Sequence, residues 1–261
     1  MVSSSQPVTP SHTPAMILAA GRGERMRPLT DHTPKPLLAA GGKRLIEWQI
    51  ERLVQAGVQR IVINHAWLGE QIPATLGDGS RYGAQFAYSD EGTALETAGG
   101  IAQALPLLKS DYFMVTNGDV YCDFPYATLL ARQAAMQANN LQAWLVLVPN
   151  PPHHPQGDFT LHHEAIVDAE TEADATPTSL TGKRYTFSGI ALYHRRLFSQ
   201  IGLGASAKLA PLLQAAITQG QVGGELFTST WVDVGTPARL SELDLLLKNN
   251  VDHSQQGNLC P

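Results

Sequence analysis

The sequence predicts an α/β fold with a mostly parallel, Rossmann-like central sheet flanked by helices. Two observations carry this prediction. Short apolar segments alternate with helical patterns between positions 15 and 148, and several of the apolar segments end at glycine or polar residues. Short apolar strands joined by helices are typical of parallel sheets that are covered on both faces. Ligands of such sheets bind beyond the carboxyl ends of the strands.

The first half of the chain alternates between the two patterns. Helices are expected where apolar residues recur at helical spacing, as in 44–56, which Gly57 closes. Pro73 weakens the short helix that is expected at 68–76. In chain order, the expected strands are 15–20, 60–64, 85–88, 112–116 and 142–148, and the remaining helices are 99–108 and 126–139.

The second half is less regular. A hairpin is expected from 159–162 and 165–168, followed by an exposed acidic loop at 169–183. Residues 185–193 alternate between polar and apolar and indicate a strand that contains Ser188-Gly189. The last expected elements are a helix at 207–219, a strand at 231–234 and a closing helix at 237–247 with proline at its start.

The chain carries no internal repeat or clear linker, so we expect one domain over 14–249 between flexible tails at 1–13 and 250–261. The first thirteen residues lack the basic start and apolar run of a signal peptide. No segment is apolar over the length that a membrane span requires.

Composition bounds the class of protein. The 261 residues are 43% hydrophobic and 16% charged, which is ordinary for a globular protein. The net charge of −5 argues against a general basic surface for nucleic acid. The two cysteines, Cys122 and Cys260, form neither a disulfide framework nor a zinc-ligand spacing, which fits a reducing compartment. We therefore expect a cytoplasmic protein without nucleic-acid or membrane partners.

A glycine-rich turn follows the first strand. Gly21 and Gly23 allow backbone N–H groups to approach an anion, and Arg25 and Lys35 supply positive charge, as a triphosphate requires. A dinucleotide fingerprint is excluded because Met26 stands where the third glycine would be, and the P-loop spacing is absent. On the glycines alone, an ordinary turn with solvated arginines is the simpler interpretation.

Two aspartates follow strands in distant parts of the chain. Asp119 ends Asn117-Gly118-Asp119, which is either a tight turn or a metal-binding carboxylate. Asp233 is flanked by Val232 and Val234, so its side chain points away from theirs, into a cleft or along a sheet edge. Magnesium takes one or two carboxylates together with phosphate oxygens and water, and this pair suits a magnesium–triphosphate site.

The small residues from Ala94 to Gly99 precede or open a helix. They let a flat base lie against the backbone, although Thr97 could equally cap the helix and the glycines could serve close packing. His153-His154 stands in a proline-rich turn, where adjacent histidines rarely converge on one metal ion, so we interpret it as a solvated loop.

Taken together, these motifs resemble a known family. Residues 18–37 are similar to the N-terminal signature of sugar-1-phosphate nucleotidyltransferases, L-A-A-G-x-G-[ST]-R-[ML]-x-P-L-[ST] followed by P-K-[PA]-[LM]. Gly118-Asp119 resembles the family's metal-binding G-D, and residues 231–236 resemble its W-x-D-x-G-T. Within the family, Glu96-Thr97-x-Gly99-Gly100 is most similar to uridylyltransferases that act on N-acetylmuramate 1-phosphate.

The resemblance implies a nucleotide-diphospho-sugar transferase fold of the GT-A-like type, without a C-terminal β-helix domain. It implies a Mg²⁺-dependent enzyme that joins a sugar 1-phosphate to UTP and releases pyrophosphate, with UDP-N-acetylmuramate for cell-wall recycling as the expected product. The implied catalytic residues are Arg25, Lys35, Asp119 and Asp233, of which Asp119 and Asp233 bind the metal. The implied nucleotide contacts are Leu18, Ala19, Ala20, Gly21, Gly23, Arg25, Ala94, Thr97, Ala98 and Gly99. The implied sugar contacts are Asn117 and Gly189.

The chain departs from the family pattern at two places. Glu24 replaces the usual Ser or Thr on the rim of the phosphate loop, which puts one side-chain contact in doubt. The family's Glu-Lys-Pro motif is missing, and the acidic region from Asp168 to Asp174 stands in its place, so its sugar-contacting Glu and Lys cannot be carried over.

Four alternatives stay open. Two share the chemistry: a glucose-1-phosphate thymidylyl- or uridylyltransferase, and a mannose-1-phosphate guanylyltransferase. A third is a non-catalytic sugar-nucleotide sensor, which could dispense with metal-binding aspartates. The fourth, a nicotinamide oxidoreductase, is disfavoured by Met26 and by the density of Arg and Lys. The oligomeric state is not indicated by the sequence.

Overall fold

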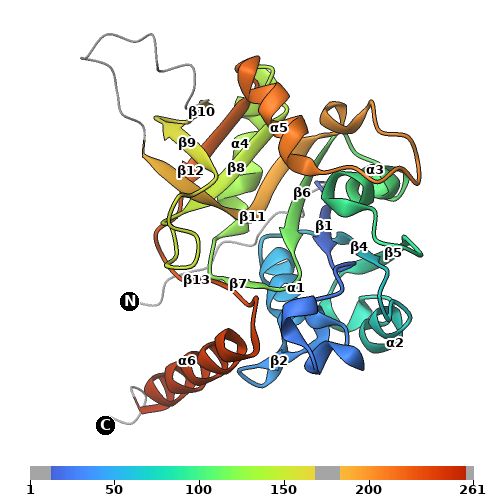
Figure 1. Ribbon diagram of the computed structural model, residues 1–261, viewed down its shortest axis with the longest axis vertical. Helices are drawn as coiled ribbons and strands as arrows, with labels where there is room; N and C mark the ends of the chain where they lie inside the picture. The colour runs from blue at the N-terminus through green and yellow to red at the C-terminus, as the bar shows by residue number, and fades with distance from the viewer. Residues whose placement is uncertain (1–12, 168–182, 257–261) are drawn as a thin grey trace.

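A nine-stranded sheet forms the centre of the molecule, in the order β5-β4-β1-β6-β11-β8-β12-β10-β9 (Figure 1). The computed structural model describes residues 13–167 and 183–256. The strands of this sheet are β1 (Ala15–Leu18), β4 (Arg60–His65), β5 (Gln85–Asp90), β6 (Tyr112–Asn117), β8 (Ala143–Val148), β9 (Phe159–His162), β10 (Ala165–Val167), β11 (Arg184–His194) and β12 (Val222–Leu226). The α-helices are α1 (Leu45–Gln55), α2 (Gln71–Leu76), α3 (Glu96–Leu108), α4 (Tyr126–Ala138), α5 (Leu209–Thr218) and α6 (Pro237–Gln256).

The sheet is parallel in its first half and mixed in its second. Strands β5, β4, β1 and β6 pair in parallel, and β8 pairs in parallel with β12. Strand β11 runs antiparallel to both β6 and β8, and β10 runs antiparallel to both β9 and β12. The expected α/β class is confirmed, and every antiparallel pairing of this sheet among the described residues involves β10 or β11.

Apolar helices cover both faces of the sheet. Alternate residues of one strand enter different cores: Ile17 packs in the core that includes residues of α1, α2 and α4, whereas Met16 packs in the core that includes residues of α3 and α5. The same alternation separates Ile63 from Val62 on β4. These strands are therefore buried on both sides, which is why they read as continuous apolar segments.

Several elements differ from the sequence-based expectation. Helix α3 begins at Glu96 rather than at 99, and α6 continues past 247 to Gln256, into the expected C-terminal tail. Strands β7 (Val120–Cys122) and β12 were not predicted, because the first is short and the second contains Gly223-Gly224, which weakens a strand signal. Residues 1–12 of the expected tail at 1–13, residues 169–182 of the expected acidic loop at 169–183, and residues 168 and 257–261 lie outside the described residues.

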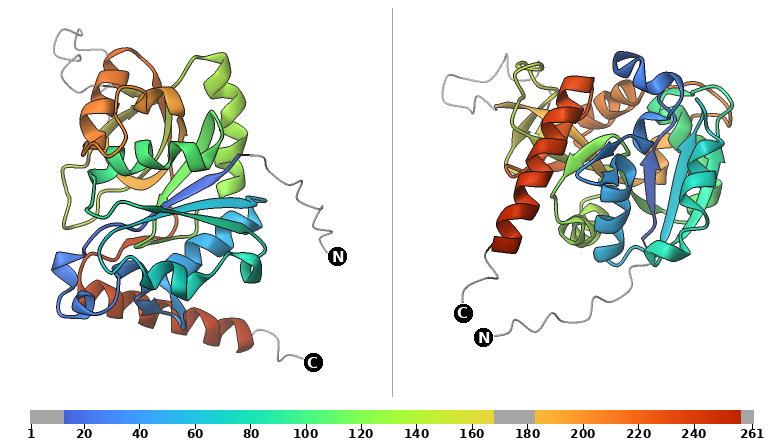
Figure 2. Two further views of the ribbon diagram at one scale, coloured as in Figure 1. Left: turned by 90° about the vertical axis from the view of Figure 1, so that its right-hand side faces the viewer. Right: turned by 90° about the horizontal axis from the view of Figure 1, so that it is seen from below.

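Helix α6 lies at the edge of the molecule against a small hairpin made of β2 (Ala39–Ala40) and β3 (Lys43–Arg44) (Figures 1 and 2). The Gly41 amide in its turn donates to the Asp244 carboxylate of α6 at 2.8 Å. Within the part of the chain that the structure describes, no helix is both long and apolar enough to cross a membrane.

A buried polar cluster between α1, β6 and α4 fixes the start of β7. The Tyr126 hydroxyl lies 2.6 Å from Gln49 Oε1 and 2.8 Å from Thr116 Oγ1, and the Gln49 amide donates to the Val120 carbonyl. All of these side chains are almost completely buried, so each depends on its partners for hydrogen bonds. The cluster anchors Val120, the residue that follows Asp119.

We expect Tyr126→Phe to destabilise the protein by about 1–2 kcal/mol, because it removes both hydrogen bonds of the hydroxyl and leaves Gln49 Oε1 and Thr116 Oγ1 only their long contact of 3.5 Å with each other. Urea unfolding followed by circular dichroism measures the loss. The control is Tyr112→Phe on β6, a half-buried tyrosine whose hydroxyl makes no hydrogen bond among the described residues. Equal stability of the two variants would contradict a structural role for the cluster.

Candidate active site

Two pockets open at the carboxyl ends of β1 and β6. The first has a volume of about 280 Å³ and includes Gly21, Gly23, Arg25, Lys35 and Asp119 in its lining. The second has a volume of about 420 Å³ and is lined by Leu18, Ala20, Gly21, Asn64, Glu91, Ala94, Glu96, Thr97, Asn117 and Asp119. Because Leu18, Gly21 and Asp119 line both, the two pockets adjoin each other along the glycine-rich turn.

The glycine-rich turn is held by its own neighbours. Gly23 has a φ of 68°, and a Cβ at this position would lie 3.1 Å from side-chain atoms of both Lys35 and Thr30. The Thr30 hydroxyl donates to the Gly23 carbonyl at 2.9 Å. Glycine is thus required both for the backbone conformation and for the close approach of Lys35. At Gly21, in contrast, the side-chain position is open space.

Side chains of the turn differ in exposure. Arg25 is exposed and lines the first pocket, whereas Lys35 is buried. Glu24, which departs from the family signature, forms an ion pair with Arg22 at 2.6 Å. The Arg22 guanidinium in turn stacks 3.9 Å from the centre of the Trp67 ring. Glu24 therefore makes an ion pair within the turn, and residues of the turn still line the first pocket.

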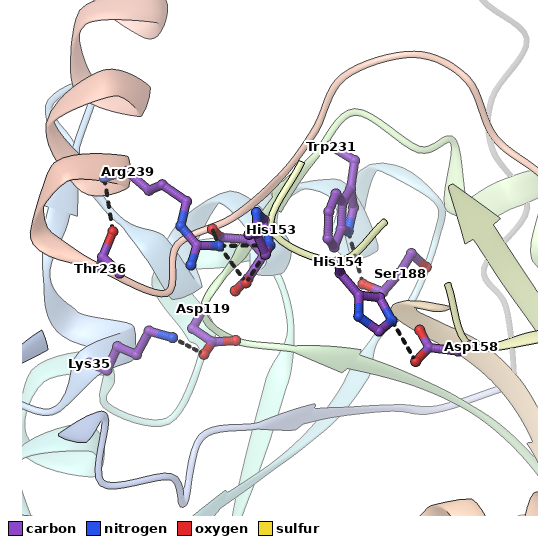
Figure 3. Close-up of polar contacts among 10 residues, drawn as sticks. Lys35, Asp119, His153, His154, Asp158, Ser188, Trp231, Thr236 and Arg239 are labelled. Atoms are coloured by element: carbon purple, nitrogen blue, oxygen red, sulfur yellow. Dashed lines mark hydrogen bonds and ion pairs between the residues drawn. The ribbon is translucent and has the colours of Figure 1, made fainter. Parts of the chain in front are cut away.

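Lys35 and Asp119 form an ion pair at the floor of the site (Figure 3). The lysine side chain is 9% exposed and the aspartate side chain 29% exposed. The pair is fixed by the backbone, since the Gly118 amide donates to the Leu18 carbonyl at 2.9 Å. A Cβ at Gly118 would lie 3.1 Å from that carbonyl oxygen, so glycine permits the turn to pack on β1.

Asp233 reaches the same region through a two-stranded ribbon. Strand β13 (Trp231–Asp233) pairs antiparallel with β7, and Asp233 lies opposite Val120. The Val234 amide donates to the Asp119 carbonyl at 3.3 Å. The ribbon thus places Asp119 and Asp233 at one end, close to each other, as the sequence interpretation expected of two metal ligands.

Asp233 is paired with Arg239, a residue that the sequence interpretation missed. Arg239 Nη1 lies 2.8 Å from Asp233 Oδ2 and 3.0 Å from the Asp233 carbonyl oxygen (Figure 3). His153 Nε2 lies 3.0 Å from the same Nη1 and 3.6 Å from Asp233 Oδ2. The expectation of a purely solvated histidine loop is therefore incomplete, because His153 is exposed but contacts the site.

The donor set fits magnesium. Within 13–167 and 183–256 there is no group of three or more His, Cys, Asp or Glu side chains that could hold a metal by itself. Two neighbouring carboxylates are the protein ligands that Mg²⁺ takes together with phosphate oxygens and water. Both carboxylates have a cationic partner in this structure, Lys35 and Arg239 respectively.

The segment from Ala94 to Gly99 divides between the pocket and the interior. Ala94 and Thr97 line the second pocket, together with Glu96, which has a positive φ of 62°. Ala98 and Gly99 are buried instead, and their amides donate to the Ala207 carbonyl at 2.9 and 3.1 Å. The structure therefore brings only part of the expected base-binding segment to the pocket surface.

A hydrogen-bonded chain joins the glycine-rich turn to this segment. The buried Asn64 side chain accepts from the Ala19 amide at 2.8 Å and donates to Glu91 Oε1 at 2.6 Å. The other Glu91 oxygen accepts from the Leu95 amide at 2.8 Å. Asn64 lies near the carboxyl end of β4, and Asp119 follows the carboxyl end of β6, so the search for polar residues at strand ends that pointed to Asp119 could also have found Asn64.

Asn117 and Gly189 lie together beside the second pocket. Strand β11 has an irregular register between Phe187 and Ile190, and Gly189 within it has a φ of 81°. A Cβ at Gly189 would lie 2.5 Å from Asn117 Nδ2, so the strand approaches Asn117 as closely as glycine allows. The two expected sugar contacts are thus adjacent, next to the pocket that Asn117 lines.

The chain is similar to known proteins over most of its length. The family model described as Nucleotidyl transferase matches residues 14–250. The chain is 52% identical to the N-acetylmuramate alpha-1-phosphate uridylyltransferase of Neisseria meningitidis, over 89% of this chain and 97% of the relative. It is 31% identical to the protein of the same name from Caulobacter vibrioides, over 87% and 97%. A Bacillus anthracis structure named as a glucose-1-phosphate thymidylyltransferase shares the fold, with a TM-score of 0.77 at 20% identity over 91% of this chain and 96% of that one.

We expect Asn64→Leu to lower the free energy of unfolding by about 1–3 kcal/mol, because the Ala19 amide and Glu91 would lose a buried partner. Hydrogen exchange should show faster exchange of the Ala19 and Leu95 amides than in the wild type. The matched control is Asn139→Leu, an exposed asparagine just after α4. Unchanged exchange rates at both amides would contradict the role of Asn64 in joining the glycine-rich turn to the segment at Leu95.

Proposed function

Because the chain belongs to the nucleotidyl transferase family, we propose that it transfers the uridylyl group of UTP to N-acetylmuramate α-1-phosphate. The products are UDP-N-acetylmuramate and pyrophosphate. The observation that carries this proposal is the 52% identity to the Neisseria uridylyltransferase over nearly the full length of both chains. The chain is a nucleotidyltransferase. Its proposed sugar substrate, N-acetylmuramate, is a cell-wall component, so we propose that the enzyme serves the reuse of cell-wall fragments. Since UTP is a cytoplasmic nucleotide, we propose that the reaction takes place in the cytoplasm.

The reaction is an in-line displacement at phosphorus. An oxygen of the sugar 1-phosphate forms a bond to the α-phosphorus of UTP, and the bond from that phosphorus to the bridging oxygen of the β-phosphate breaks. The electron pair leaves with pyrophosphate. Because the attacking oxygen is already anionic, the protein needs no general base, and its task is to position the two phosphates and neutralise their charge.

The glycine-rich turn is suited to the leaving pyrophosphate. Gly21 and Gly23 line the first pocket, and exposed Arg25 lines it beside the buried Lys35. In the proposal, the turn amides and Arg25 bind the β- and γ-phosphates. Lys35 lies deeper, next to Asp119, and would contact the α-phosphate or the sugar phosphate. A buried lysine is held in few conformations, which favours a fixed position for that phosphate.

Asp119 and Asp233 would hold Mg²⁺, which when bound neutralises charge on the α-phosphate and the leaving oxygen. The side chains around the two carboxylates have a separate task. Lys35 and Arg239 each pair with one aspartate and so orient the two carboxylates.

The second pocket is the proposed place of the uracil base and the start of the sugar site. Ala94 and Thr97 would face the base, while Ala98 and Gly99 support the segment from behind by their bonds to the Ala207 carbonyl. Asn117, which lines the same pocket, and the adjacent Gly189 would contact the sugar. The reacting phosphates then meet between these regions, beside Asp119.

A screen for pyrophosphate release tests the substrates. We expect UTP with N-acetylmuramate 1-phosphate to give the highest kcat/KM among the four nucleoside triphosphates crossed with N-acetylmuramate, N-acetylglucosamine, glucose and mannose 1-phosphates. A clear preference for dTTP with glucose 1-phosphate or for GTP with mannose 1-phosphate would replace the assigned substrates. No release with any pair would favour a sugar-nucleotide sensor.

We expect Asp119→Asn and Asp233→Asn each to lower kcat by at least about 100-fold, because charge stabilisation at the α-phosphate is lost. Chelation of divalent cations should abolish wild-type turnover, and added Mg²⁺ should restore it. Circular dichroism checks that both variants are folded. Asp123→Asn serves as control, since Asp123 is exposed on the same ribbon. Activity of either site variant within a few-fold of the wild type would remove that residue from the metal site.

A further inference from the structure

A third pocket opens on the far side of Asp233. It has a volume of about 510 Å³, and Pro151, Pro152, His153, Trp231, Asp233 and Arg239 contribute to its lining. Most of these residues come from two segments, the proline-rich turn after β8 and the region from β13 to the first turns of α6. The pocket is not used by the nucleotide contacts described above.

The pocket lies between the expected sugar strand and the proposed metal carboxylates. At one end, the Trp231 indole donates to the Ser188 carbonyl at 3.0 Å, and Ser188 precedes Gly189 (Figure 3). At the other end is Asp233. A sugar whose ring lies on Gly189 and whose 1-phosphate lies near Asp119 has this pocket within reach of its ring substituents.

Arg239 gives the pocket a positive group with unused donors. Its Nη1 serves Asp233 and His153, whereas Nε and Nη2 have no hydrogen-bond acceptor within the described residues. The guanidinium side chain is only 18% exposed. A Cβ at residue 235 would lie 2.8 Å from Nη2, so Gly235 leaves the space that the guanidinium occupies. Two donors on one planar edge match the two oxygens of a carboxylate.

One guanidinium and two carboxylates line the pocket. Arg239 is the sole lysine or arginine among the residues that the structure shows lining this pocket, and its proline and tryptophan walls are apolar. The two acids of the lining differ: Asp233 is already paired, and Glu242 is exposed to solvent, where its charge is screened. His153 next to the guanidinium adds a further polar group on the same side.

We propose that Arg239, supported by His153, binds a carboxylate on the sugar and thereby selects an acidic sugar 1-phosphate over its neutral counterpart. The inference rests on the proposed function, since it requires a sugar 1-phosphate in the site. It assigns a specificity-determining contact to a residue at the start of α6, outside the motifs that identify the nucleotide site.

The test compares two acceptors that differ in the carboxylate. N-acetylmuramate 1-phosphate carries a lactate ether, and N-acetylglucosamine 1-phosphate lacks it. The ratio of their kcat/KM values is measured for the wild type and for Arg239→Gln, Arg239→Lys and His153→Gln. We expect the ratio to fall about 10- to 100-fold in Arg239→Gln, as for loss of a charged hydrogen bond, with smaller decreases in the other two. Binding of UDP-N-acetylmuramate, measured by calorimetry, should weaken in the same order.

The control is Arg184→Gln. Arg184 is an exposed arginine at the start of β11 whose Nη2 contacts the carbonyls of Gly157 and Asp158, and its variant should leave the ratio unchanged. A similar loss for both sugars in Arg239→Gln means that Arg239 serves only Asp233 and overturns the inference. If Arg239→Gln does not fold, an unchanged ratio in both Arg239→Lys and His153→Gln overturns it. A wild type that prefers the neutral sugar refutes the proposed substrate itself, and the inference with it.

Discussion

The whole site depends on the parallel pairing of β1 with β6. In this register Leu18 lies opposite Asn117, and the Gly118 amide bonds to the Leu18 carbonyl. The pairing brings the glycine-rich turn and Asp119 together, although they are far apart in the chain. Because side chains alternate along a strand, a shift of β1 by one residue would exchange the faces on which Met16 and Ile17 are buried and would move Leu18 away from Asn117. The two cores that hold β1 from both sides therefore also fix the geometry of the cleft.

Sequence patterns predicted the site residues that follow the ends of strands. They did not predict the residues that hold those site residues in position. Gly21, Lys35, Asp119 and Asp233 follow recognisable motifs, and the parallel half of the sheet follows from apolar strands joined by helices. The reversal of β11 was not predictable, because a single strand pattern carries no information on direction. Ala98 and Gly99 were expected at the pocket, but their amides bond to the carbonyl of Ala207, which lies just before α5 although the sequence pattern placed it inside that helix. Arg239 was missed because an arginine in the first turns of a helix looks like an ordinary surface residue.

Two cations from distant segments stabilise the carboxylates at the centre of the cleft. Lys35 belongs to a short 3-10 helix after the glycine-rich turn, and Arg239 belongs to α6. Helix α6 looks peripheral in Figure 1, yet it both packs on the β2–β3 hairpin through Asp244 and carries Arg239 to Asp233. The position of the outer helix is thus coupled to the position of a carboxylate in the site. The attachment of α6 to the hairpin therefore helps to hold Arg239, and through it Asp233, in position.

The hydrogen bonds from the first turn of α3 to the Ala207 carbonyl have an evolutionary consequence. In many nucleotide-binding folds the phosphate sits on the N-terminus of a helix, whose amides are backbone groups that no substitution can remove. Here two amides of the first turn of α3 are already bonded to Ala207, so the proposed phosphate site is built from the glycine-rich turn and the side chains of Arg25 and Lys35. Side chains can be replaced one at a time. The affinity of such a site for phosphate can be adjusted by single substitutions, while the helix that carries the neighbouring segment stays unchanged.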